Sequence, residues 1–166
     1  MVHGAAWQAL KLEGEMNARA RLVVSVAWFC LVIVTGASLV AVLNVRPGIV
    51  DNFYAYPVGW LIPFTVAAAL AAIMYFNAKG QDRRTFIASS VYLASMLGGA
   101  VFGLYPNVLP AIDPANSLTI YNARAGSYGL GVGIIWWSIG IVIALGYFTF
   151  LFRTFKGKIA VTSDGH

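Results

Sequence analysis

The side chains best suited to ligate a metal ion or a haem iron in this sequence are His3, Cys30 and His166. The two histidines lie at the ends of the chain, where neither is placed to ligate a haem inside a packed bundle. Cys30 stands alone, without a Cys-x-x-Cys-His motif, and we interpret it as a small buried apolar residue. A glycine-rich phosphate loop and a Ser/His/Asp set are also missing. We therefore predict no catalytic residue, no bound cofactor and no metal ion in this chain.

Four apolar stretches contain no Asp, Glu, Lys, Arg or His, and any functional residue of the chain must be positioned by them. They are Leu22–Leu43, Gly59–Asn77, Phe86–Tyr105 and Tyr128–Phe152. Each is long enough, at about 1.5 Å per helical residue, to cross a hydrocarbon core of roughly 30 Å. Ionisable side chains inside a membrane usually mark proton relays, ion sites or cofactor ligands. Because these stretches have none, we do not expect the chain itself to carry out proton or electron chemistry.

Composition supports a membrane protein, since hydrophobic residues make up 60% of the chain, charged residues 10%, and the mean hydropathy is +0.76. The predicted fold class is all-α: a polytopic membrane bundle of four transmembrane helices. Residues 1–21 are expected to form either the end of a preceding helix or an interfacial amphipathic helix, with Glu15 and Arg19 spaced as an i,i+4 pair. Residues 22–159 form the predicted bundle, and residues 160–166 form a cytoplasmic tail.

Basic residues cluster at the ends of the apolar stretches and do not form a continuous face, so no nucleic acid is expected as a partner. The side opposite the predicted cytoplasmic side holds Arg46 and Arg124. By the positive-inside rule, both termini are expected to be cytoplasmic. The nine basic residues of the inner side are Lys11, Arg19, Arg21, Lys79, Arg83, Arg84, Arg153, Lys156 and Lys158.

Small residues recur at four-residue spacing on two of the predicted helices. Ser95, Gly99 and Gly103 form one such stripe, and Gly129 and Gly133 form another. Stripes of this kind let helix backbones approach closely in lipid. We predict that both stripes pack against neighbouring helices.

A longer connection, 106–127, separates the last two apolar stretches on the outer side and shows no evident regular structure. It is too apolar for disorder, and long ordered connections are often functional. Its polar run is our best site candidate, with side-chain amides and hydroxyls either satisfying backbone groups of the loop or contacting a ligand or interface. The candidate residues are Asn116, Ser117, Leu118, Thr119, Tyr121 and Asn122.

These loop residues carry a resemblance to a known family. The stretches Phe102–Pro110 and Asp113–Ala123 resemble the outer-loop signature of subunit II of cytochrome bd-type quinol oxidases, in particular the cyanide-insensitive branch. The similarity extends, in family order, from about residue 2 to residue 159. Family members typically have Pro-Ser-Ser where this chain has Pro110–Ala111–Ile112. Further similar segments are His3–Ala5, Lys11–Glu15, Arg19–Arg21, Asp51–Phe53, Tyr56–Pro57 and Trp136–Trp137.

The resemblance implies a multi-pass subunit of a respiratory terminal oxidase in the bacterial inner membrane. In that family subunit I carries haems b and d and the quinol site, and the complex reduces oxygen to water. Subunit II, built from two similar four-helix bundles, scaffolds subunit I. This chain resembles the second bundle, so its expected partners are subunit I, the N-terminal half of subunit II and lipid. On its own the chain is not expected to catalyse the reaction.

An alternative is a small-molecule transporter subunit built from a repeat bundle. Such proteins usually have broken helices and polar sites near the membrane midplane, and Pro63 is the one hint of a broken helix in this sequence. The pair Trp136 and Trp137 leaves two interpretations open, packing in the core or contact with an apolar ligand.

Overall fold

The computed structural model describes residues 1–155 and 157. Over these residues the chain forms two compact units, residues 1–103 and residues 104–157, which are described separately. Unit 1 contains α1 (Val2–Lys11), α2 (Gly14–Val45), η1 (Pro47–Val50), α3 (Asp51–Ala55), η2 (Pro57–Trp60), α4 (Leu61–Ala78) and α5 (Asp82–Leu104). Unit 2 contains β1 (Asn107–Leu109), η3 (Pro114–Asn116), β2 (Leu118–Thr119) and α6 (Ser127–Thr154).

The described residues include four helical segments long and apolar enough to span a membrane, which confirms the predicted all-α membrane fold. These segments are Gly14–Val45, Pro57–Ala78, Asp82–Leu104 and Ser127–Thr154. The first begins eight residues before the apolar stretch does, because the helix continues through the polar sequence ahead of Leu22. At 32 residues α2 is about 48 Å long, so one end must extend beyond the hydrocarbon core.

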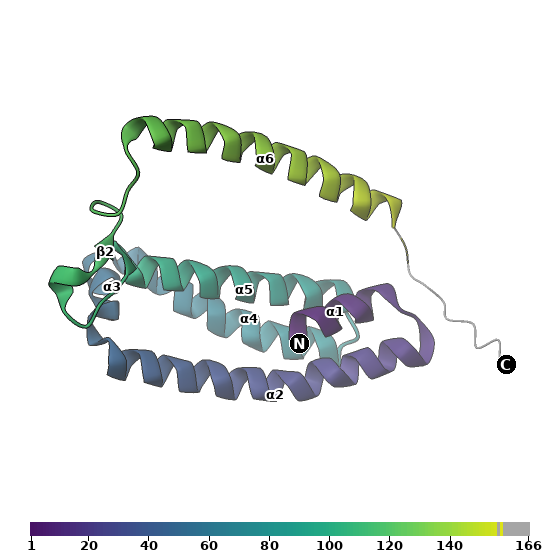
Figure 1. Cartoon of the computed structure of the whole chain (residues 1–166). Coiled ribbons are helices and arrows are strands. Elements are labelled where there is room, and N and C mark those ends of the chain that lie inside the picture. The colour runs from purple at the N-terminus through teal and green to yellow at the C-terminus, as the bar shows by residue number, and fades with distance from the viewer. Residues whose placement is uncertain (156, 158–166) are drawn as a thin grey trace. The chain divides into compact units, whose positions relative to one another are not determined.

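The short helix α1 packs into unit 1 through an alanine-rich face. It folds back against α2, while α4 and α5 form an antiparallel hairpin beside them (Figure 1). Gly14 allows the reversal because its φ of 62° is in the left-handed region that glycine adopts readily. The buried residues of α1 are Val2, Ala5, Ala6 and Ala9. These small side chains face the other helices of unit 1, and whether residues 1–21 lie at the membrane interface stays a prediction.

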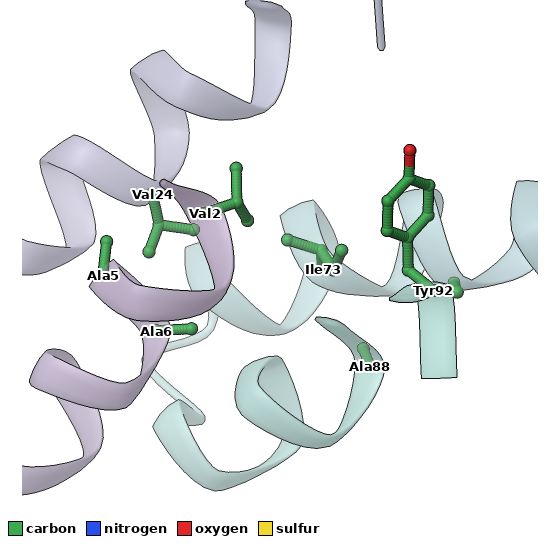
Figure 2. Packing of buried hydrophobic residues seen from close by; sticks show 8 residues of the cluster. Val2, Ala5, Ala6, Val24, Ile73, Ala88 and Tyr92 are labelled. Atoms are coloured by element: carbon green, nitrogen blue, oxygen red, sulfur yellow. The ribbon is translucent and has the colours of Figure 1, made fainter. Parts of the chain in front are cut away.

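The core of unit 1 gathers one to three residues from each of four helices. Val2, Ala5 and Ala6 of α1 lie near Val24 of α2, Ile73 of α4, and Ala88 and Tyr92 of α5 (Figure 2). Val24, Ile73 and Ala6 are fully buried. Most of these side chains are small. The helix backbones can therefore approach one another closely, and the core contains few large side chains.

Two hydrogen bonds within the apolar layer join α2 to its neighbours. Trp28 Nε1 donates to the Leu70 carbonyl of α4 at 2.8 Å. The hydroxyls of Thr35 and Tyr92 of α5 are 2.7 Å apart. In lipid such a bond is worth about 0.6–2 kcal/mol. The two hydrogen bonds of Trp28 and Thr35 therefore help to fix α2 against α4 and α5.

Pro63 does not interrupt a helix in the middle of a span. It lies in the first turn of α4, where the missing amide is not needed for an intrahelical hydrogen bond. Thr65 Oγ1 donates to the Leu61 carbonyl at 2.7 Å. The hint of a broken helix, on which the transporter alternative depended, therefore disappears.

The interpretation of Cys30 as a buried residue is wrong for the described structure. Its side chain is exposed on α2. The neighbouring Phe29 is also exposed, at 57%. An apolar environment in a membrane protein can be supplied by lipid as well as by a core, and sequence hydropathy does not distinguish the two.

Candidate functional site

The α5–α6 loop, residues 105–126, has more regular structure than expected. Strands β1 and β2 pair in an antiparallel arrangement, with Asn107 opposite Thr119. The Ile120 amide donates to the Pro106 carbonyl at 3.0 Å, and the hydroxyls of Tyr105 and Tyr121 are 2.9 Å apart. Pro106 precedes β1 rather than lying within it, so it leaves the strand amides available for pairing. The expectation of a loop without regular structure was wrong.

Three of the predicted site residues hydrogen-bond to the loop backbone. Asn122 Oδ1 accepts from the Thr119 amide at 2.6 Å, and its Nδ2 donates to the Ser117 carbonyl at 2.9 Å. Thr119 Oγ1 accepts from the amides of Tyr121 and Asn122. Ser117 Oγ, which is buried, accepts from the Ala111 amide at 3.1 Å. Together these bonds close the turn after β2 and attach Ser117 to Ala111, two residues after β1.

The other three candidates have different surroundings. Asn116 Nδ2 donates to Asp113 Oδ2 at 3.2 Å, on the exposed surface of the loop. Leu118 is 46% exposed and Tyr121 is 63% exposed. The motif therefore has one side that closes the loop and another that faces outward. A role for that outward side at an interface stays a prediction.

Removing the Asn122 side chain should loosen the loop. Asn122→Ala loses one acceptor and one donor, each bond being worth about 0.5–1.5 kcal/mol. We expect faster proteolysis of residues 106–126 in the purified protein, by roughly fivefold, with no change in helix content.

The matched control for this loop variant is Asn116→Ala, which removes one exposed hydrogen bond. Its proteolysis rate should stay close to that of the unaltered chain. Equal rates for the Asn122 and Asn116 variants would contradict the proposed role of Asn122.

A buried polar cluster lies where the α1–α2 turn meets the α4–α5 turn, and sequence reasoning missed it. Asp82 is 8% exposed and accepts from Arg21 Nε at 2.8 Å and Arg21 Nη2 at 3.0 Å. Asn17 Nδ2 donates to Asp82 Oδ2 at 3.0 Å and to the Ala9 carbonyl at 2.6 Å. We call Asn17, Arg21, Asn77 and Asp82 the Arg21–Asp82 cluster.

The remaining contacts of the cluster extend it to α4. Asn77 Nδ2 donates to the Arg21 carbonyl at 3.1 Å and to Ser25 Oγ at 2.9 Å. Arg21 Nη2 also donates to the Gly80 carbonyl at 3.0 Å. Gly80 has a φ of 71°, in the left-handed region that favours glycine, and a Cβ there would lie 2.7 Å from Arg21 Nη1 and so would displace the guanidinium.

The Arg21–Asp82 cluster therefore connects four helices at one end of unit 1. Arg21 was counted as a topology signal, yet its charge is paired with a buried carboxylate. The signal in the sequence was Asp82 itself, an acid that directly follows the turn residues Gly80 and Gln81 at the start of an apolar helix. Such an acid needs a partner if the turn is packed against protein.

The small-residue stripe of α5 lies against other parts of unit 1. A Cβ on Gly99 would lie 3.2 Å from Ile62 Cγ2, and one on Gly103 would lie 2.8 Å from Ile49 Cγ1. Ser95, the first residue of the stripe, is half-buried. For Gly129 and Gly133 of α6, packing against a helix stays a prediction, because α6 buries none of its residues within unit 2.

The potential ligand His3 lies inside unit 1. His3 Nδ1 lies 2.8 Å from Ser89 Oγ, and its ring stacks on Phe86 with the centroids 4.7 Å apart. This histidine is thus packed between α1 and α5, inside unit 1, which its position at the end of the sequence does not indicate. No group of three or more His, Cys, Asp and Glu side chains gathers within residues 1–155 and 157. His166 lies outside the described residues.

A protein family model matches most of the chain. A search of curated proteins found no match. The family model described as cytochrome bd terminal oxidase subunit II matches residues 1–155, which include all four candidate spans and the whole α5–α6 loop. The chain therefore belongs to the cytochrome bd terminal oxidase subunit II family.

Proposed function

We propose that this chain is a non-haem subunit of a quinol-oxidising terminal oxidase and that it scaffolds the haem-bearing subunit. The observation that carries the proposal is the family match over residues 1–155. Quinol as the electron donor, and haems b and d in the partner subunit, come from the resemblance noted in the sequence.

The distribution of polar groups supports a scaffolding role. His3, Trp28, Thr35 and Tyr92 all hydrogen-bond to other residues of unit 1. The described residues have no buried side-chain nitrogen or oxygen atom without a hydrogen-bond partner. A site that moves protons or electrons usually keeps some polar groups available for its ligand. In unit 1 these groups instead hold helices together.

The outer faces of the helices provide surface for partners. On α2, exposed side chains at i and i+4 include Phe29 at 57% and Ile33 at 70%. Apolar faces of this size require lipid or protein contact. We propose subunit I and the N-terminal half of subunit II as the protein partners, with lipid covering the rest.

For orientation, we propose the bacterial inner membrane with both termini in the cytoplasm. The support is the distribution of basic residues. Nine lie on the predicted side of the α4–α5 turn, and the opposite side has Arg46 and Arg124. In a Cys30→Ala background, Glu13→Cys and Ile112→Cys provide exposed labelling sites at the α1–α2 turn and the α5–α6 loop. We expect an impermeant thiol reagent to label them from opposite sides of the membrane. Labelling of both from one side would contradict this topology.

The function is tested by purifying the chain from native membranes through an affinity tag. We expect the purified fraction to show haem b and haem d absorption together with quinol-driven oxygen uptake. When the detergent extract is dissociated, the haem should remain with the partner subunit and not with this chain. A purified fraction without haem would overturn the proposed function.

A further inference from the structure

An open apolar groove of about 420 Å³ lies between α4 and α5 in unit 1. Helix α4 lines it from Thr65 to Phe76, and α5 lines it from Arg84 to Val91. Four of its nine lining residues are alanines, and these small side chains leave the groove open between bulkier neighbours. Thr65 Oγ1 donates to the Leu61 carbonyl, so the hydroxyl at that end already has an acceptor.

The length of the groove fits one lipid leaflet. Thr65 and Phe76 are 11 residues apart on α4, which is about 16 Å along the helix axis. Half of a hydrocarbon core of roughly 30 Å is about 15 Å. The length of the groove therefore matches that of a single acyl chain.

The groove ends at a positive charge. The Arg84 guanidinium lies 5.6 Å from the centroid of the Phe76 ring, and its Nη1 donates to Gln81 Oε1 at 2.8 Å. These two contacts hold an exposed guanidinium at the mouth of an apolar channel. A planar guanidinium with several donors binds phosphate well.

Among the described residues, no acid forms an ion pair with Arg84. Arg83 and Lys79, on the same α4–α5 connection as Arg84, are also exposed, and the Lys79 ammonium lies over the Tyr75 ring. Asp82, the acid of the same turn, is buried in an ion pair with Arg21. Within the described part of the chain, no ion pair joins Arg83 or Arg84 to a carboxylate. Basic residues near a membrane surface attract anionic lipid headgroups.

We propose that this groove is a binding site for an anionic phospholipid. One acyl chain lies along α4 and α5 between Thr65 and Phe76, and the phosphate binds Arg84. Arg83 and Lys79 favour an anionic headgroup over a zwitterionic one. The lipid comes from the leaflet that contacts the α4–α5 turn. A bound lipid would cover the alanine-lined face of the subunit without a protein partner.

The test uses the complete complex in vesicles of phosphatidylcholine that contain a trace of phosphatidylglycerol with a diazirine on its acyl chain. After illumination, mass spectrometry should locate the label within residues 65–76 or 84–91. Excess unlabelled phosphatidylglycerol should reduce this labelling at least threefold, and excess phosphatidylcholine should not. Equal competition by the two lipids would overturn the proposal of an anionic site.

Two pairs of variants separate the groove from general membrane contact. Ala68→Phe fills the groove, whereas Ala67 is exposed on α4 but does not line it, so Ala67→Phe is the control. Arg84→Gln removes the charge, and Arg153→Gln, in the last turn of α6, is its control. We expect at least threefold less labelling in Ala68→Phe and Arg84→Gln, and unchanged labelling in both controls.

Unchanged labelling in both groove variants would overturn the site. A photoreactive amino acid placed at Ala68 gives an independent result. Its crosslinking to phospholipid supports the proposal. Its crosslinking to α6 or to another subunit would show that protein covers the groove, and the proposal would be abandoned.

Discussion

Asp82→Ala is expected to destabilise the described part of the chain by roughly 2–3 kcal/mol. The substitution leaves the Arg21 guanidinium without its carboxylate and removes an acceptor from Asn17. Breaking a fully buried ion pair costs about 3–5 kcal/mol, and the Arg21 side chain is 34% exposed, so we expect a smaller loss. The free energy of unfolding of the purified chain in mixed micelles would be measured by titration with a denaturing detergent.

The double variant Arg21→Met/Asp82→Leu should recover most of this loss, because replacing both charges removes the unpaired group. Glu15→Ala is the matched control, since it breaks the Glu15–Arg19 pair, whose side chains are 77% and 68% exposed. An exposed pair of this kind contributes about 0–1 kcal/mol. Equal destabilisation by Glu15→Ala and Asp82→Ala would show that the buried pair has no special role.

Gly103→Leu is expected to have the second largest effect. Gly103 is buried, and a Cβ there would lie 2.8 Å from Ile49 Cγ1 and 3.4 Å from the Ile49 carbonyl oxygen. The larger side chain must push α5 away from η1, at a cost of about 1–3 kcal/mol. We expect a lower yield of assembled complex from membranes and a lower Tm.

Gly98→Leu provides the comparison on the same helix, because nothing lies within 4 Å of a Cβ at that position. Its yield and Tm should match those of the unaltered chain. A loss in Gly98→Leu as large as that in Gly103→Leu would indicate a general intolerance of α5, and the close contact at Gly103 would not explain it.

The membrane fold could be predicted because it depends on a local property. A stretch without charges that is long enough to cross the bilayer has few alternatives to a transmembrane helix. The Glu15–Arg19 pair could also be predicted, since i,i+4 spacing places both side chains on one helix face.

The Arg21–Asp82 pair could not be predicted in the same way. Its members are 61 residues apart, and their contact depends on how the α1–α2 and α4–α5 hairpins pack. The same limit applies to Cys30, because an apolar stretch does not reveal which of its faces meets protein. For His3, the sequence position gave no indication that α1 packs against Phe86.

The α5–α6 loop is an intermediate case. Its polar run was recognised, and the side chains of Ser117, Thr119 and Asn122 hydrogen-bond to nearby backbone groups. The pairing of β1 with β2 was not recognised, because strands of three and two residues are too short to show alternation.

The most direct test of the proposed function is quinol-driven oxygen uptake in membranes from host cells that lack this chain. Oxygen uptake would be measured in the presence of cyanide, because the sequence resembles the cyanide-insensitive branch of the family. We expect the cyanide-resistant uptake and the haem d absorption to be lost in these membranes and to be restored when the chain is supplied again. Unchanged uptake and unchanged haem d absorption without the chain would contradict its role as a subunit of the oxidase.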